Sequence, residues 1–214
     1  MQAADHADSS SETGSGADTL VHMSERPQQP RIAPVVDPDE AQLELLAKAP
    51  ALPDGTVRNI FTTLLHHPVL LQRFNALAGT FFRFSHITAY ERELLIVRVA
   101  GRTGSRYEYG QHLALARDAG LSDEVIRAVL LQDGAPALSP EDQLLADVTD
   151  ELLARGELGD AHWNALAQRY DTPALLEIVL TIGFYRMTAD MLKTVGVQLE
   201  EQPDLELDWS AIAR

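Results

Sequence analysis

A glutamate and a histidine four positions apart, Glu108 and His112, are the residues whose types and spacing best suit chemistry. The segment that carries them has a helical pattern, so both side chains project from one helix face and can contact each other. A carboxylate beside an imidazole orients the ring, and such a pair can transfer a proton near neutral pH. The spacing alone also fits two simpler interpretations, a surface ion pair and a core histidine whose hydrogen bonds are satisfied.

A second carboxylate, Glu93, lies in the preceding segment, which begins at Thr88 and is apolar at most positions. Thr88 and Glu91 have the spacing of a capping box, so the start of this helix does not need Glu93. A short turn at Gly104 would fold this helix and the next into an antiparallel hairpin. We therefore expect Glu93 near the pair as a second acid or base, although the helix dipole also favours an acid in a first turn.

Three further residues are candidates for contacting a substrate. Arg98 carries a guanidinium that can bind a carboxylate through two hydrogen bonds, with a salt bridge inside the protein as the alternative. His86 precedes the apolar helix, where it can line the mouth of a pocket, and Tyr185 is expected either to line the pocket or to pack in the core. A metal site of His86, His112 and a carboxylate is conceivable, but no two histidines have the i, i+4 spacing, so we expect no metal.

Composition excludes several classes of function. The formal net charge is -15, which disfavours nucleic acid and anionic membrane surfaces as partners. The sequence has no cysteine, so it has no disulfide, thiolate nucleophile or iron–sulfur cluster. No apolar run reaches the roughly 18 residues of a membrane span, and the N-terminal residues do not resemble a secretory signal. We expect a cytoplasmic protein.

The chain divides into three parts. Residues 1–30 are rich in small and polar residues and are expected to be a disordered tail, residues 31–203 a single helical domain, and residues 204–214 a loose C-terminal tail. No alternating strand pattern or hairpin signal is present, so we predict an all-α fold of about eight helices. Asp37 is expected to cap the first helix, with Pro38 at its first position. The expected helical segments are 37–49, 57–66, 68–84, 88–102, 106–119, 122–131, 139–154, 160–170 and 172–199.

Two blocks, R-E-L-L-I-V-R-V-A at 92–100 and Y-E-Y-G-Q-H-L-A-L-A-R-D-A-G-L-S at 107–122, resemble the core motif of the carboxymuconolactone decarboxylase and alkylhydroperoxidase-like superfamily. The relatives read roughly E-L-x-I-L, then E-Y/W-x-x-H, then A-x-x-x-G-L-S/T. Further blocks of the same family resemble H-H-P-V-L-L at 66–71 and I-G-F-Y-R-M at 182–187. The resemblance covers most of residues 55–195 and implies a compact, oligomeric helical bundle.

The family has two chemical branches, and the cysteines distinguish them. The peroxidase branch carries C-x-x-C before the histidine, and the matching positions here are Ser105 and Glu108. A serine cannot form a disulfide, so thiol peroxidase activity is excluded. The decarboxylase branch keeps a glutamate and the histidine and needs no cofactor, and Glu93, Glu108 and His112 match its acid–base positions. Tyr107 replaces the peroxidase's intervening histidine and fits a reshaped, substrate-contacting pocket.

The resemblance implies a cofactor-independent acid–base enzyme, of lyase type, acting on a small organic acid, lactone or related carbonyl compound. His112 would move the proton and Glu108 would orient the ring. It also implies a homo-oligomer, often a trimer or hexamer in this family. Two alternatives remain open: a tailoring enzyme of secondary metabolism with another substrate, and a non-catalytic helical binding protein.

Overall fold

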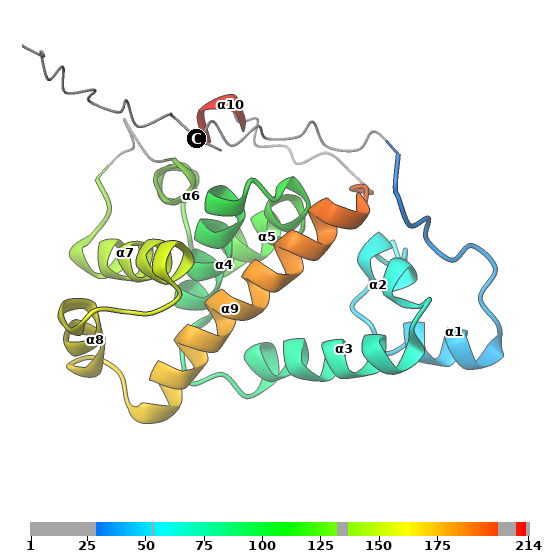
Figure 1. Ribbon diagram of the computed structural model, residues 1–214, viewed down its shortest axis with the longest axis horizontal. Coiled ribbons are helices and arrows are strands. Elements are labelled where there is room, and N and C mark those ends of the chain that lie inside the picture. The colour runs from blue at the N-terminus through cyan, green and yellow to red at the C-terminus, as the bar shows by residue number, and fades with distance from the viewer. Residues whose placement is uncertain (1–28, 53, 132–136, 201–208, 213–214) are drawn as a thin grey trace, which may run out of the picture.

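The computed structural model describes residues 29–52, 54–131, 137–200 and 209–212 (Figure 1). These residues form an all-α fold, as predicted, and among them the only β-type pairing is an isolated bridge between Ala51 and Val57. The helices in chain order are α1 (Glu40–Leu46), α2 (Asn59–Leu64), α3 (Pro68–Arg83), α4 (Ala89–Thr103), α5 (Arg106–Asp118), α6 (Asp123–Leu130), α7 (Pro140–Arg155), α8 (Asp160–Ala167), α9 (Thr172–Val195) and α10 (Trp209–Ile212).

Helix α4 lies at the centre of the bundle. It packs against α5, α6, α7 and α9, and α9 crosses in front of it in the view of Figure 1. Every residue from Arg92 to Gly101 is buried, which explains why this helix is apolar on nearly all sides. The predicted capping box is present, since the Thr88 side chain accepts from the Glu91 amide and the Glu91 carboxylate accepts from the Thr88 amide.

The turn between α4 and α5 makes the predicted hairpin. Gly104 ends α4 in the left-handed conformation, with φ of 65°, which is strained for residues that carry a Cβ. Ser105 follows and α5 begins at once, so the two helices pack side by side. The hairpin places Glu93 of α4 beside His112 of α5, and this arrangement builds the site described below.

Several helix ends differ from the prediction by a few residues, and the start of α1 and the end of α9 have a clear local cause. Asp39, not Asp37, caps α1: its carboxylate accepts from the Gln42 amide at 2.8 Å, and the Gln42 side chain accepts from the Asp39 amide at 2.9 Å. This reciprocal pair satisfies two amides at once and fixes the start of the helix. Helix α9 ends at Val195 instead of about residue 199, because Gly196 adopts the left-handed conformation with φ of 74°.

The structure describes only part of each chain end. The predicted disordered tail spans residues 1–30, of which 1–28 lie outside the described residues. Residues 204–208 and 213–214 of the predicted loose C-terminal tail also lie outside them. Between the latter, Trp209–Ile212 form α10, which the sequence analysis did not predict. Ile212 is buried in the core, and the Trp209 ring meets the Tyr109 ring edge-on at 5.3 Å, so this part of the tail packs against the bundle.

The buried apolar side chains form two clusters. The larger one surrounds α4 and includes the inner faces of α5, α6, α7 and α9. The smaller one joins α1 and α2 to Tyr107 of α5 and Leu192 of α9. Phe74 of α3 packs against both clusters, so α3 closes the space between them. No helix in the described part of the chain is both long enough and apolar enough to cross a membrane.

Candidate active site

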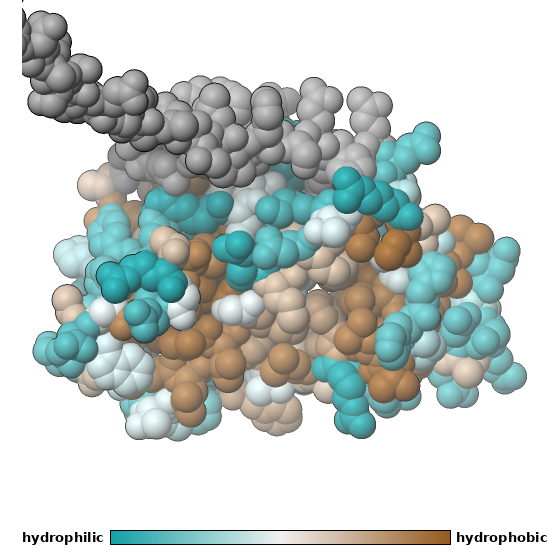
Figure 2. Space-filling model, viewed as in Figure 1, coloured by the Kyte–Doolittle hydropathy of each residue, from teal (hydrophilic) through white to brown (hydrophobic). Residues whose placement is uncertain are grey.

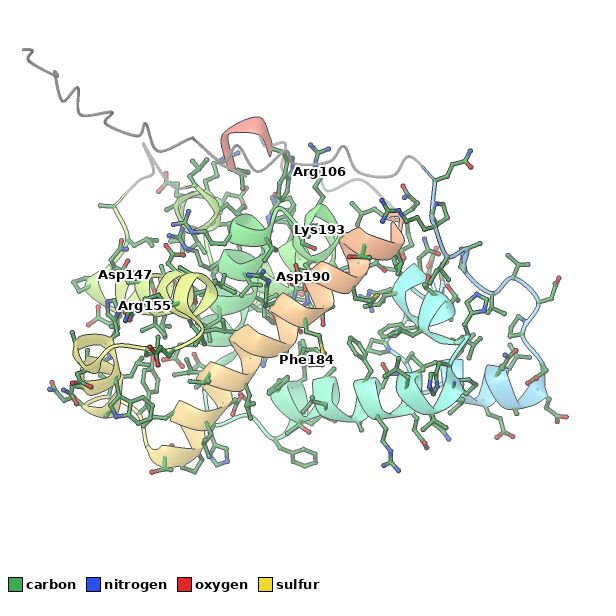
Figure 3. All side chains as sticks on the ribbon, in the orientation of Figure 1. Arg106, Asp147, Arg155, Phe184, Asp190 and Lys193 are labelled. Atoms are coloured by element: carbon green, nitrogen blue, oxygen red, sulfur yellow. The ribbon has the colours of Figure 1, made fainter. Side chains whose placement is uncertain are left out.

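A cavity of about 570 Å³ lies where the two apolar clusters meet, between α2, α3, α5 and α9. Its volume falls within the range of pockets that hold a small organic ligand. Aromatic rings form much of its wall, and Phe184 projects from α9 toward α3, where its ring stacks on Phe74 at 4.9 Å (Figure 3). The polar residues that line it are Lys48, Arg58, Asn75, Arg83, Tyr107, Glu108, Gln111, His112, Tyr185 and Thr188.

His112 reaches this cavity from α5, and a buried carboxylate holds its ring. The Nδ1 atom lies 2.7 Å from Oε2 of Glu93, a residue of α4 that is fully buried. The other carboxylate oxygen of Glu93 accepts a hydrogen bond from the Arg92 guanidinium at 3.0 Å. With Nδ1 engaged by the carboxylate, Nε2 is the ring nitrogen left for the cavity, in the tautomer that can accept a proton.

Arg92 completes this chain of polar contacts. Its guanidinium lies over the Phe82 ring at 4.3 Å and donates to the Phe81 carbonyl at 3.4 Å. Glu93 is therefore held between a guanidinium and an imidazole, with both carboxylate oxygens in use. A carboxylate in this position orients its neighbour and has no free oxygen to offer a substrate.

Glu108 lies on the wall of the same cavity, and it differs from Glu93 in its hydrogen bonding. Its side chain is buried, and neither carboxyl oxygen has a hydrogen-bond partner among the described residues. Burial raises the pKa of Glu108 well above its ordinary value of 4.5, and the Ser105 hydroxyl and the Lys193 ammonium of α9 oppose this shift only in part (Figure 3). These surroundings favour a neutral carboxyl group with a proton to donate.

Two tyrosines complete the polar wall. The Tyr185 ring meets the His112 ring edge-on at 5.1 Å, and burial together with the charge of Glu93 raises the pKa of Tyr185 well above 10.0. The Tyr107 hydroxyl accepts from the Ile60 amide at 3.1 Å and donates to Glu200 at 3.0 Å. Burial also raises the pKa of Tyr107, so both tyrosines remain protonated. The Tyr107 hydroxyl already has two hydrogen-bond partners within the protein.

Comparison with known proteins finds one family model that matches the middle of the chain. Residues 68–151 match the model of the carboxymuconolactone decarboxylase family, and this stretch includes Glu93, Glu108 and His112. The middle part of the chain therefore resembles this family. No curated protein sequence matches the chain.

Solved structures share the fold at low sequence identity. A peroxidase-related protein from Silicibacter sp. TM1040 superposes with a TM-score of 0.68 at 18% identity, over 83% of this chain and 95% of the other. An alkylhydroperoxidase AhpD core protein from Ralstonia eutropha JMP134 gives 0.65 at 21% identity, over 79% and 93%. A cysteine-to-alanine variant of the debrominase Bmp8, in complex with 2,3,4-tribromopyrrole, gives 0.59 at 17% identity, over 81% and 93%.

The expected pairing of Glu108 with His112 is wrong. Both side chains line the cavity, but the imidazole bonds to Glu93, nineteen residues away in the sequence. The hairpin explains this, because it brings the buried face of α4 against the imidazole and leaves Glu108 without a hydrogen-bond partner in the described structure. The geometry therefore exchanges the positions of the two acids: Glu93 orients the ring, and Glu108 faces the cavity.

Two of the predicted substrate contacts lie elsewhere. Arg98 does not line the cavity, because its guanidinium makes two hydrogen bonds to Asp150, at 2.8 and 2.6 Å, and also donates to the Val129 and Leu131 carbonyls. The salt-bridge alternative describes it. His86 is exposed and does not line the cavity, and only its backbone amide is engaged, by Glu177 at 2.6 Å. Tyr107 and Tyr185 do line the cavity.

The conceivable metal site does not form as a unit. His86 and His112 are not brought together, since only His112 lies on the cavity wall. Within the described ranges, no group of three or more histidine, aspartate or glutamate side chains is arranged to hold a metal ion.

The cations at the cavity were not among the residues predicted from the sequence. Lys48 follows α1, Arg58 precedes α2, and Arg83 ends α3, so they come from three separate segments. No spacing rule connects them in the sequence, and only the packing of α1 and α2 against α3 brings them to one wall. Arg92 was also missed, although its position next to Glu93 gave a local signal.

Proposed function

We propose that this protein is a cofactor-independent acid–base enzyme that moves a proton to or from carbon in a small organic acid, lactone or related carbonyl compound. The observation that carries the proposal is the 2.7 Å contact of His112 with buried Glu93, on the wall of a cavity that also holds Glu108. An oriented imidazole and a neutral carboxyl group on one apolar wall are the two groups that such chemistry needs.

His112 is the proton-transferring group in this proposal. Its Nε2 lone pair takes a proton from the carbon next to a carbonyl group, and the imidazolium that results is stabilised by the Glu93 carboxylate. In the reverse direction the imidazolium returns the proton to carbon. Arg92 keeps Glu93 in place, because a carboxylate bound by two donors is fixed in orientation.

Glu108 is the electrophilic partner in this proposal. When a proton leaves carbon, negative charge develops on the substrate's carbonyl oxygen, and a neutral carboxyl group can donate a hydrogen bond to it. The apolar surroundings that raise the pKa of Glu108 keep this donor protonated. Removal of a proton from carbon begins an isomerisation or an elimination, and delivery of a proton to carbon completes a decarboxylation, after CO₂ has left, or a hydration, after water has added. The place of the reaction in the lyase class is part of the proposal.

Similarity to the carboxymuconolactone decarboxylase family supports an enzyme. One structural neighbour favours a second candidate function. The debrominase Bmp8 shares the fold and binds 2,3,4-tribromopyrrole, so the fold accommodates a halogenated heteroaromatic ring. This favours the alternative of a tailoring enzyme of secondary metabolism on the same scaffold. The present chain has no cysteine, so a thiol cannot take part in its chemistry.

The decisive experiment measures turnover on a panel of lactones and keto acids with wild type, His112→Ala and Glu108→Gln. Each substitution should lower kcat by about 10²–10⁴-fold without changing the helical circular dichroism. His162→Ala is a matched control, because His162 also bonds a glutamate, Glu151, at 2.7 Å but lies outside the cavity. Full activity in the His112 variant would disprove the assignment.

We also propose that the protein acts as a homo-oligomer that associates through α9. Leu176, Leu180 and Met187 follow one stripe of this helix and are 60%, 56% and 53% exposed. Figure 2 shows hydrophobic side chains gathered over the same part of α9. An exposed apolar stripe of this kind is typical of an interface between subunits.

A further inference from the structure

The charge of the cavity is opposite to that of the protein. The whole chain has a formal net charge of -15, yet the residues that line the cavity include three cations, Lys48, Arg58 and Arg83. The only acid among these lining residues is Glu108, whose raised pKa favours its neutral form. Within the described structure the cavity is therefore a positive region on a negative protein, which favours an anionic ligand.

The three cations differ in their contacts within the protein. Arg58 is already engaged, because its guanidinium donates to Gln111 of α5 and to the Pro50 carbonyl at 2.9 Å, and so holds the segment after α1 in place. Lys48 and Arg83 have no hydrogen-bond or ion-pair partner in the described part of the chain. They are also exposed, whereas His112 and Glu108 are buried. Lys48 and Arg83 therefore mark the mouth of the cavity, and the acid–base groups mark its inner wall.

A second hollow confirms where the mouth lies. It has a volume of about 280 Å³ and shares Lys48, Asn75 and Arg83 with the main cavity. These two cations therefore stand where the two hollows meet. Gly79, one turn before Arg83, leaves room for the guanidinium to lie back against α3, since a methyl group there would overlap it. The arginine is thus directed along the helix and over the cavity.

The part of the cavity away from these two cations is aromatic and not charged. Its aromatic lining comes from three helices: Phe61 of α2, Phe74 and Phe82 of α3, and Phe184 and Tyr185 of α9. Flat, apolar groups pack well against such rings. The cavity thus has one aromatic end and one cationic end.

We propose that Lys48 and Arg83 bind a carboxylate of the substrate at the mouth, while an apolar, ring-containing body fills the aromatic part of the cavity. This rests on the proposed function, in that the same cavity receives the substrate. It narrows the substrate class to amphipathic carboxylates larger than a simple lactone acid. Arg98 was the predicted carboxylate-binding residue, but its guanidinium is bound to Asp150. We assign this role to Lys48 and Arg83 instead.

The test compares two probes of the same shape, 2-naphthoate and the neutral 2-naphthamide, by isothermal titration calorimetry. Wild type should bind naphthoate several-fold more tightly, and raising the salt from low to high concentration should reduce this difference. Lys48→Gln and Arg83→Gln should each weaken naphthoate binding by about two- to fivefold, as expected for one exposed charge, and leave naphthamide unaffected. In the double variant the preference for the carboxylate should disappear.

Arg73→Gln is the matched control, because Arg73 is an exposed arginine of the same helix that does not line either hollow. The proposal is overturned if wild type binds the two probes equally, if it binds neither at millimolar concentration, or if the Arg73 variant weakens naphthoate binding as much as the Arg83 variant does.

Failure of this proposal can be told apart from failure of the proposed function. Charge-dependent naphthoate binding that persists in His112→Ala, without turnover of any panel substrate by wild type, supports the carboxylate site and contradicts the enzyme. Turnover that requires His112, with naphthoate binding insensitive to Lys48 and Arg83, supports the enzyme and contradicts the carboxylate site.

Discussion

The Nδ1 atom of His112 lies 2.7 Å from Oε2 of Glu93, and this contact joins the two helices of the α4–α5 hairpin. The carboxylate is fully buried and the imidazole is 8% exposed, so the contact is shielded from water on the α4 side and open to the cavity on the other. A hydrogen bond in such surroundings fixes both the orientation and the tautomer of the ring. The first prediction follows from this relationship.

Replacing Glu93 by glutamine should impair His112 without removing it. The amide keeps the size of the side chain but loses the charge that stabilises an imidazolium and selects the Nδ1–H tautomer. We expect kcat to fall by about 10²–10⁴-fold, and long-range ¹⁵N–¹H correlation spectra should show His112 changing from one tautomer to a mixture. Glu151→Gln, which disturbs the equivalent contact of His162, should leave turnover unchanged. An unchanged His112 tautomer in the Glu93 variant would contradict the orienting role.

Glu108 should make stability depend on pH in the direction opposite to that of most acids. Its pKa is raised by burial in the folded state, so between 4.5 and the raised pKa the folded protein binds more protons than the unfolded one. Stability must then fall as pH rises through this window, by at most about 1.4 kcal/mol per pH unit from this group. Glu108→Gln, which is neutral throughout, should remove this contribution.

Chemical denaturation at several pH values measures this effect. The Glu108 variant should gain stability relative to wild type as pH rises above 4.5, and the difference should reach a constant value below that pH. A constant difference across the whole range would show that Glu108 titrates normally and is not held in its neutral form.

Asp150 should be important for stability and not for substrate binding. It accepts hydrogen bonds from both Arg98 and Arg102, whose side chains are 6% and 15% exposed. Burial acts to raise the pKa of Asp150, but these two arginines outweigh it, and the pKa is lowered from 3.8. Its stabilising contribution is therefore present above pH 3.8 and lost as pH falls through the lowered pKa.

Asp150→Asn should lower the free energy of unfolding by about 3 kcal/mol, because it leaves two largely buried guanidinium groups without their carboxylate. Asp147→Asn, one turn earlier on α7, removes the charge of this side chain but keeps an oxygen that can accept from Gln143, and it should change stability by less than about 0.5 kcal/mol (Figure 3). Urea denaturation distinguishes the two. Equal effects would mean that the arginines do not depend on Asp150.

The α9 stripe should control the oligomeric state. Size-exclusion chromatography with light scattering should show wild type as an oligomer, and the double variant Leu176→Glu, Leu180→Glu as a smaller species with unchanged helicity. Leu43→Glu, which places a charge at a residue of α1 that is 54% exposed, is the control and should leave the oligomer intact. A monomeric wild type would contradict the proposal.

Local signals in the sequence determined most of the helices. Pro68, Pro140 and Pro173 lie at or next to helix starts, and the caps Thr88, Ser122 and Ser139 form the hydrogen bonds that their types predict. These boundaries are set by backbone groups within one turn, so neighbouring residues suffice to predict them. The apolar pattern of α4 likewise predicted its central position. The family motif brought Glu93, Glu108 and His112 to attention, and the absence of cysteine excluded thiol chemistry.

Only the tertiary structure decided which carboxylate serves which purpose. Helical spacing made Glu108 and His112 neighbours on one face, but the hydrogen bond of His112 goes to Glu93, because the rotation of α5 against α4 decides where the ring points. The packing of the helices also pairs Arg98 with Asp150, fifty-two residues away in the sequence. It places Lys48 and Arg83 together at the cavity mouth. Contacts between helices depend on their relative orientation, which the periodicity of a single helix does not contain.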